Sequence, residues 1–172
     1  MSATASPRAR ITGTSRRRPP PTVIVLAALF GLLAVGALQG GLAMVRDPHQ
    51  PLGMSPEFLD RAPIDTYFWP GMFLLGIAAA SILTLAGLLF DWRWRWASRI
   101  EKQIGHRWPW LGAFSTAGVL LVFELLELYI VPLHPVMHPT LIIASLLMLG
   151  LTLSPPTSDF LEVPDFLGVS DD

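Results

Sequence analysis

Residues 120–139 read LLVFELLELYIVPLHPVMHP, and they combine an apolar helix with ionisable side chains. The segment is apolar enough to lie in lipid, yet it contains Glu124 and Glu127, followed by His134 and His138. A charged side chain inside a bilayer costs at least about 2.5 kcal/mol, so it must be neutralised, paired or hydrated. The segment therefore predicts a membrane helix that carries a polar site near one end.

The composition is that of a membrane protein. Of 172 residues, 52% are apolar and only 15% are charged, whereas soluble domains carry about 25% charged residues. The apolar residues come in long blocks, which indicates lipid-facing helices and not one water-shielded core. The chain has no cysteine, which excludes disulfides and thiolate metal sites. No phosphate-binding glycine motif is present, and we expect no cofactor and no nucleic-acid partner.

Four apolar blocks predict an all-α integral membrane bundle of four transmembrane helices within residues 22–153. The blocks are 22–45, 72–90, 111–131 and 136–153. The first has 24 uncharged residues, or about 36 Å of helix, enough to cross a hydrocarbon core of about 30 Å. The fourth is the shortest, because its uninterrupted apolar part is only Thr140–Leu153. A re-entrant segment is the alternative for that block.

The basic residues predict the orientation. Of the twelve, five lie in the proline-rich arm of residues 1–21, five in the loop 91–110, and two in the loop 46–71. Because cytoplasmic loops carry the excess of lysine and arginine, we expect the arm and the loop 91–110 to be cytoplasmic. The loop 46–71 is then external, and the acidic tail 154–172 is cytoplasmic in a plasma membrane. The arm is expected to be disordered, since it has little apolar surface to bury.

The loop 91–110 contains an alternation of tryptophan and arginine at Trp92–Trp96. Amphipathic rings prefer the headgroup level of a bilayer, and arginine side chains reach lipid phosphates from there. The pattern therefore favours an interfacial belt that binds anionic lipid headgroups.

Short motifs flank the second apolar block. They are Asp47-Pro48, Leu52-Gly53-Met54, Leu59, Ala62-Pro63-Ile64-Asp65-Thr66-Tyr67, Pro70-Gly71 and, after the third block, His134-Pro135. Together they resemble a family of small, uncharacterised four-span integral membrane proteins of bacteria, largely actinobacteria. Its pattern has Asp-Pro-Ser-Gly, Leu-Gly-Leu-Pro and Phe-x-Asp-Tyr, and this chain departs from it at His49-Gln50, Met54 and Ile64. The resemblance covers about residues 23–153; it implies the four-span fold and location, and no activity or catalytic residue.

The candidate polar site lies in the outer half of the predicted bundle. Glu124 is 13 residues beyond Leu111, about 20 Å along the third helix, and Glu127 shares its face at i+3. The residues expected near this height are Glu124, Glu127, His134, His138, Gln39 in the first span and Arg46 at its end.

Three interpretations of this site remain open. In the first, the carboxyls bond to a neighbouring helix or to Arg46 and fix helix register or a homo-oligomer. In the second, the glutamates and histidines form a proton or cation pathway. In the third, carboxylates and imidazoles bind zinc or another transition ion. Because proline interrupts the stretch from His134 to His138 and no His-Glu-x-x-His motif is present, we assign no metal ligands.

The tail contains a tandem repeat of acidic and apolar residues. Its candidate docking residues are Asp159, Phe160, Leu161, Asp165, Phe166 and Leu167. An acidic segment with regular apolar anchors is typical of a peptide ligand for a partner protein. The alternative is that the tail folds back on the basic loop 91–110.

The sequence therefore favours a non-enzymatic accessory or scaffold subunit. Its expected partners are the lipid bilayer and either a second copy or another membrane protein. A proton- or cation-coupled transport component that uses Glu124 and Glu127 is the alternative. A metal-dependent intramembrane enzyme is the third.

Overall fold

The computed structural model describes residues 18–54, 56–60, 62–90, 97–130 and 137–163. Within these ranges the chain forms six α-helices, two short 3-10 turns and no β-strand. The elements are α1 (Pro21–Arg46), η1 (Pro51–Gly53), η2 (Pro56–Leu59), α2 (Phe68–Phe90), α3 (Ser98–Ile104), α4 (Trp108–Ile130), α5 (Met137–Leu153) and α6 (Pro155–Leu161). The arm 1–17 and the stretch Trp92–Trp96 lie outside the described residues.

The expected all-α architecture is confirmed over the described residues. Three helices, α1, α2 and α4, are long and apolar enough to cross a membrane. The fourth expected span differs from these, because α5 has 17 residues and passes the same test only together with α6. These two helices meet at a bend of 59°. The described chain therefore offers three spanning helices, or four if the bent pair counts as one.

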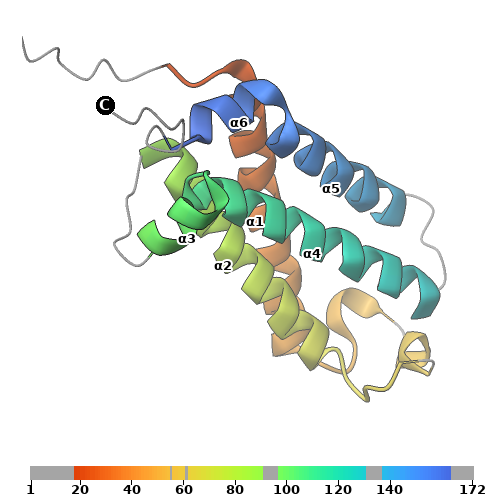
Figure 1. The fold of residues 1–172 in the computed structure, drawn as a ribbon. Coiled ribbons are helices and arrows are strands. Elements are labelled where there is room, and N and C mark those ends of the chain that lie inside the picture. Colours follow the sequence, from red (N-terminus) through yellow and green to blue (C-terminus); the bar gives the residue numbers. More distant parts are fainter. Residues whose placement is uncertain (1–17, 55, 61, 91–96, 131–136, 164–172) are drawn as a thin grey trace, which may run out of the picture.

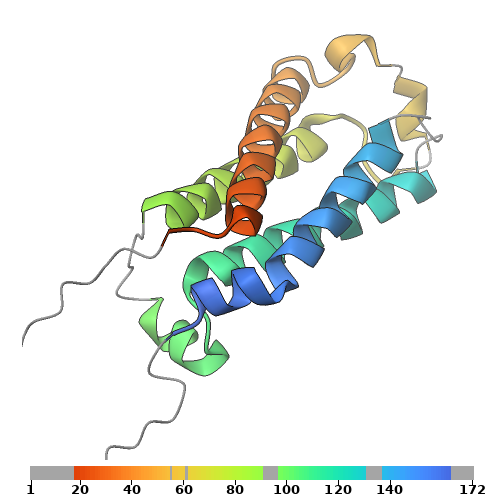
Figure 2. The same cartoon turned by 90° about the horizontal axis from the view of Figure 1, so that it is seen from above.

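The helices pack as two pairs, α1 with α2 and α4 with α5, which join through α2–α4 and α1–α5 contacts. Figures 1 and 2 show α4 and α5 lying side by side, with α1 crossing α2. The largest core cluster draws on five helices, through Phe30 of α1, Leu88 of α2, Ala117 of α4, Met148 of α5 and Leu161 of α6. At the α2–α4 contact the rings of Phe73 and Phe123 stack with centroids 4.4 Å apart.

Glycines lie at close approaches between helices. A Cβ on Gly41 of α1 would lie 2.9 Å from the carbonyl oxygen of Gly71 in α2. A Cβ on Gly87 of α2 would lie 2.5 Å from the indole of Trp108 at the start of α4. Because real side chains do not approach this closely, the helices reach these distances only where the side chain is missing.

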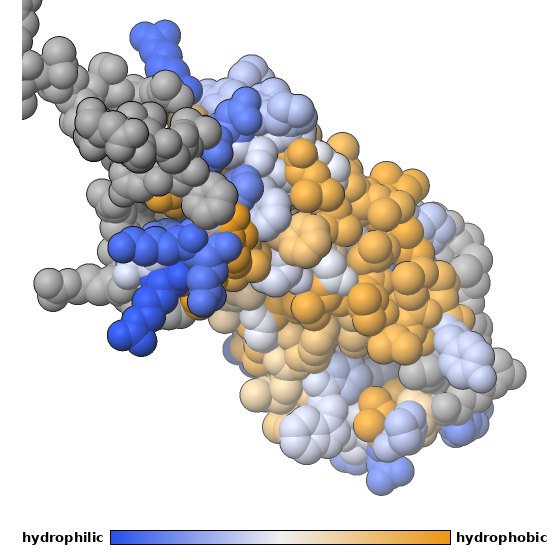
Figure 3. Space-filling view, in the orientation of Figure 1, coloured by the Kyte–Doolittle hydropathy of each residue, from blue (hydrophilic) through white to orange (hydrophobic). Residues whose placement is uncertain are grey.

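The side of the bundle is apolar and the ends are polar. Leu32 and Val35 of α1 are 72% and 67% exposed, and Val122 and Leu126 of α4 are also exposed. Figure 3 shows hydrophobic side chains over the middle of the visible face, with hydrophilic residues towards both ends. A bundle in water would leave these large aliphatic side chains unshielded, and their contiguous exposure is typical of helices surrounded by lipid.

The bundle has a loop end and a tail end. The loop end carries residues 47–67, the last turn of α4 and the first turn of α5. The tail end carries residues 97–107 and 154–163, where α3 and α6 lie (Figure 1).

The tail forms a helix that the sequence pattern does not predict. Pro155 and Pro156 occupy the first positions of α6, where a missing N–H leaves no hydrogen bond unmade. Leu161, the last residue of α6, is only 1% exposed and joins the main core cluster. Burial of this side chain supplies the stabilisation that a seven-residue helix lacks on its own.

Candidate functional site

The centre of the candidate site is a buried pair formed by Glu124 of α4 and His138 of α5. Nδ1 of His138 lies 3.3 Å from Oε2 of Glu124, and the two side chains are 1% and 2% exposed. The residues are 14 positions apart and meet because α4 and α5 pack against each other as consecutive helices. Each side chain supplies the partner that the other needs once both are removed from water.

Glu127 lies one turn further along α4 and is only partly buried. One carboxylate oxygen from each glutamate and a ring nitrogen of His138 all lie within 4.8 Å of one another. The three side chains therefore form one polar cluster, with Glu127 on its more exposed side. We call Glu124, Glu127 and His138 the loop-end cluster.

Tyr67 adjoins this cluster from the loop. Its backbone N–H donates a 2.9 Å hydrogen bond to the carbonyl of Pro48, so the two ends of the loop 48–67 are held together. The side chain is 5% exposed. Burial, and then the negative charge of Glu127, raise the pKa of the Tyr67 hydroxyl above its ordinary value. Tyr67 is not among the residues that the sequence predicts for the site, although it ends the motif Ala62–Tyr67 that precedes the second apolar helix.

The structure does not bring Gln39 and Arg46 to the loop-end cluster. Both side chains are exposed, and Arg46 is the last residue of α1. The buried face of α1 includes Ala37 and Gly41, and Gln39 is rotated by about 200° from Ala37 around the helix. Helical phase therefore turns Gln39 away from the bundle. His134 lies outside the described residues.

Buried hydroxyl groups nearer the tail end do not extend the cluster. Ser81, Ser145 and Thr152 each donate a 2.7 Å hydrogen bond to the backbone carbonyl four residues earlier in their own helix. The protons of these three hydroxyls are thus donated within their own helices and not to a neighbouring helix.

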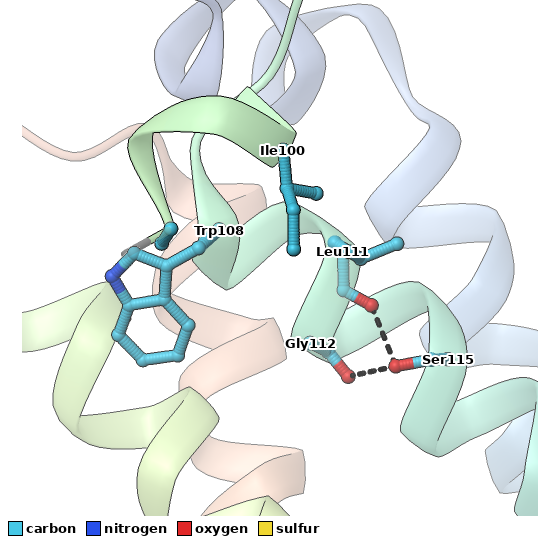
Figure 4. Close-up of a pocket in the computed structure, with 6 residues that line it drawn as sticks. Ile100, Trp108, Leu111, Gly112 and Ser115 are labelled. Atoms are coloured by element: carbon cyan, nitrogen blue, oxygen red, sulfur yellow. Dashed lines mark hydrogen bonds between the residues drawn. The ribbon is translucent and has the colours of Figure 1, made fainter. Parts of the chain in front are cut away.

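A separate pocket lies at the tail end between α3 and the first turns of α4. It has a volume of about 180 Å³ and is lined by Ala97, Ile100, Trp108, Leu111, Gly112 and Ser115. In Figure 4 the hydroxyl of Ser115 donates to the carbonyls of Leu111 and Gly112, at 2.7 and 3.3 Å. Ser115 is nine residues from Glu124, or about 14 Å along the helix. The pocket is mostly apolar and has no titratable lining residue, so it is not part of the candidate site.

The tail residues proposed as a docking motif divide into two groups. In α6, Asp159 is exposed, Phe160 is half-buried and Leu161 is buried in the core of the chain. The described part of the tail thus folds back on the bundle through apolar and backbone contacts. Asp165, Phe166 and Leu167 lie outside the described residues.

No family model matches the chain, and no curated protein or solved structure is significantly similar to it.

Proposed function

We propose that the chain is a multi-pass protein of the plasma membrane that acts as a non-enzymatic accessory or scaffold subunit. The apolar belt of the bundle and its spanning helices support the location. The orientation rests on the basic residues, ten of which lie in the arm 1–21 and the loop 91–110. Both termini are then cytoplasmic, and the loop end faces outward.

The observation that carries the accessory role is the burial of the Glu124–His138 pair. At 2% and 1% exposure, the pair offers no open face to a molecule of substrate size. A catalytic acid or base must lie within hydrogen-bond reach of its substrate, which this arrangement does not offer. The pair instead fastens α4 to α5 at the loop end.

A second bond fastens the same two helices at the tail end. The indole N–H of Trp110 in α4 donates a 3.1 Å hydrogen bond to the backbone carbonyl of Thr152 in α5. Polar bonds between helices in lipid contribute about 0.6 to 2 kcal/mol each and select one register. A hairpin held at both ends is suited to present fixed surfaces to a partner protein.

One observation favours the second candidate, a proton- or cation-coupled transport component. Glu127 is partly exposed beside the buried Glu124. An ion from the loop end could therefore reach the carboxyl of Glu127 before that of Glu124. The locally bonded hydroxyls of Ser81, Ser145 and Thr152 weigh against a continuous path to the tail end.

Reconstitution into liposomes separates the two candidates. The full chain, Glu124→Gln and Glu127→Gln are compared in vesicles that contain a pH-sensitive dye. An accessory subunit leaves a pH gradient intact in all three samples, while Glu124→Gln lowers the unfolding temperature. If the full chain dissipates the pH gradient and both variants do not, the chain is a transport component and not an accessory subunit.

A further inference from the structure

The loop-end cluster holds a set of ligand types that transition metals prefer. Two carboxylates and one imidazole offer oxygen and nitrogen atoms within 4.8 Å of one another. Hard cations such as Mg²⁺ and Ca²⁺ favour all-oxygen sites, whereas imidazole suits zinc and its neighbours. The three residues come from two helices, α4 and α5, that already pack together.

The distance within the buried pair fits a shared metal ion. Charge-assisted hydrogen bonds between nitrogen and oxygen are usually about 2.7–2.9 Å long. Nδ1 of His138 and Oε2 of Glu124 are 3.3 Å apart, which is longer. Two ligands of a tetrahedral zinc ion, each bound at about 2.0–2.1 Å, also lie about 3.3 Å apart. The pair is thus already at the spacing of one tetrahedron edge.

The third ligand is the one that is free to adjust. Glu127 is partly exposed, so its side chain has room to change rotamer. Its ligand oxygen already lies within 4.8 Å of the other two ligand atoms and must move closer to complete a tetrahedron face whose edges are about 3.3 Å. Glu124 and His138, which are buried, need not move relative to each other.

Charge balance also favours a divalent ion. Two carboxylates carry two negative charges, and a neutral imidazole adds none. A divalent cation makes the whole cluster neutral, which removes the cost of holding like charges together in a low-dielectric bundle. A monovalent cation would leave one negative charge uncompensated.

We propose that Glu124, Glu127 and His138 bind one divalent transition-metal ion of the zinc type at the loop end of the bundle. The fourth coordination position lies on the side of Glu127, which is the exposed side of the cluster. The ion would replace a single hydrogen bond between α4 and α5 by a three-ligand bridge. The metal site goes beyond the accessory role, which depends on the packing of α4 against α5 and not on the metal.

The test uses the full chain in detergent micelles, purified without a histidine tag and stripped with a chelator. Zn²⁺ and Co²⁺ are titrated separately and followed by calorimetry, by unfolding temperature and, for Co²⁺, by its visible absorption bands. We expect one ion per chain, a higher unfolding temperature and the intense bands of a tetrahedral Co²⁺ site. Glu127→Gln is expected to weaken binding more than about tenfold, because it removes a ligand.

Two matched variants control for surface binding. Asp65→Asn removes an exposed carboxylate of the same loop, and His49→Asn removes an exposed imidazole there. Both should bind metal as the unaltered chain does. Glu127→Gln is the decisive variant, because Glu127 is only partly buried and its loss leaves the Glu124–His138 pair in place.

The proposal is overturned if the unaltered chain binds no ion at micromolar concentration, or if Glu127→Gln binds as tightly as the unaltered chain. A loss of binding in His49→Asn would equally assign the ion to the surface. The accessory role is judged separately in metal-free buffer, by whether Glu124→Gln lowers the unfolding temperature there.

Discussion

The backbone N–H of Arg107 donates a 2.7 Å hydrogen bond to the carbonyl of Leu161, across 54 positions of sequence. Next to it, the N–H of Val163 donates to the carbonyl of Gly105 at 3.0 Å, and the two bonds enclose an antiparallel bridge between His106 and Glu162. The imidazole of His106 also lies 2.7 Å from the hydroxyl of Ser158. The tail thus closes the end of the bundle through backbone pairing.

This closure predicts that Leu161 stabilises the whole bundle. Leu161→Ala should lower the free energy of unfolding by about 2–5 kcal/mol, because it leaves a cavity in the core. The measurement is reversible unfolding in mixed micelles. Asp159→Ala on the exposed side of α6 should change it by less than about 0.5 kcal/mol. Equal effects of both variants would mean that α6 does not pack as described.

The Glu124–His138 pair predicts strong non-additivity. His138→Leu should destabilise the chain by about 3–5 kcal/mol, because it leaves a buried carboxyl without its partner. Replacing both residues by leucine should recover most of this loss, since paired apolar residues are often as stable as a buried ion pair. A double-mutant cycle in metal-free micelles measures the coupling. Additive losses would show that the two side chains act independently.

The contact between Gly87 and Trp108 predicts a position-specific effect of alanine. Gly87→Ala places a methyl group 2.5 Å from the indole and should destabilise the bundle by about 1–3 kcal/mol through overpacking. Gly76→Ala lies in the same helix with nothing within 4 Å of its Cβ. It should be neutral or slightly stabilising in the same unfolding assay. A neutral Gly87→Ala would argue against the close α2–α4 contact.

The proposed orientation predicts opposite labelling of two positions. The chain has no cysteine, so single cysteines report accessibility without a background. Asp65→Cys in the loop should react with an impermeant maleimide added to intact cells. Gln103→Cys, which is exposed in α3, should react only after the membrane is permeabilised. The reversed pattern would invert the topology and place the loop-end cluster on the cytoplasmic side.

The position of Tyr67 beside Glu127 predicts a pH dependence. The raised pKa of Tyr67 means that the folded chain keeps this proton at pH values where the unfolded chain has lost it. Stability should therefore fall as pH rises above about 10, the ordinary tyrosine pKa. In a Tyr129→Phe background, ultraviolet titration follows Tyr67 alone, because the chain has two tyrosines. Glu127→Gln should lower the pKa of Tyr67. An unchanged pKa would show that the charge of Glu127 does not act on the Tyr67 hydroxyl.

Local features were sufficient to predict where the long helices lie. The expected blocks 22–45 and 72–90 match α1 (Pro21–Arg46) and α2 (Phe68–Phe90) to within a few residues. An uninterrupted apolar run can satisfy its backbone in lipid only by bonding within itself, so the helix follows directly from composition. For the same reason the sequence alone identifies the glutamates of α4 as anomalous.

The partners of those glutamates depended on information that a single helix does not contain. Glu124 meets His138 and not Arg46, Gln39 is turned outward, and Tyr67 joins the cluster from a loop. Which side chains meet is set by the rotation and height at which helices pack, and these follow from contacts such as Gly41–Gly71. The burial of Leu161 has the same origin, since a seven-residue helix is stabilised only by the surface it covers. Sequence alone determined the helices and their unusual charges, because backbone hydrogen bonding is local. The tertiary structure decided the pairing, because packing brings together residues that are distant in the chain.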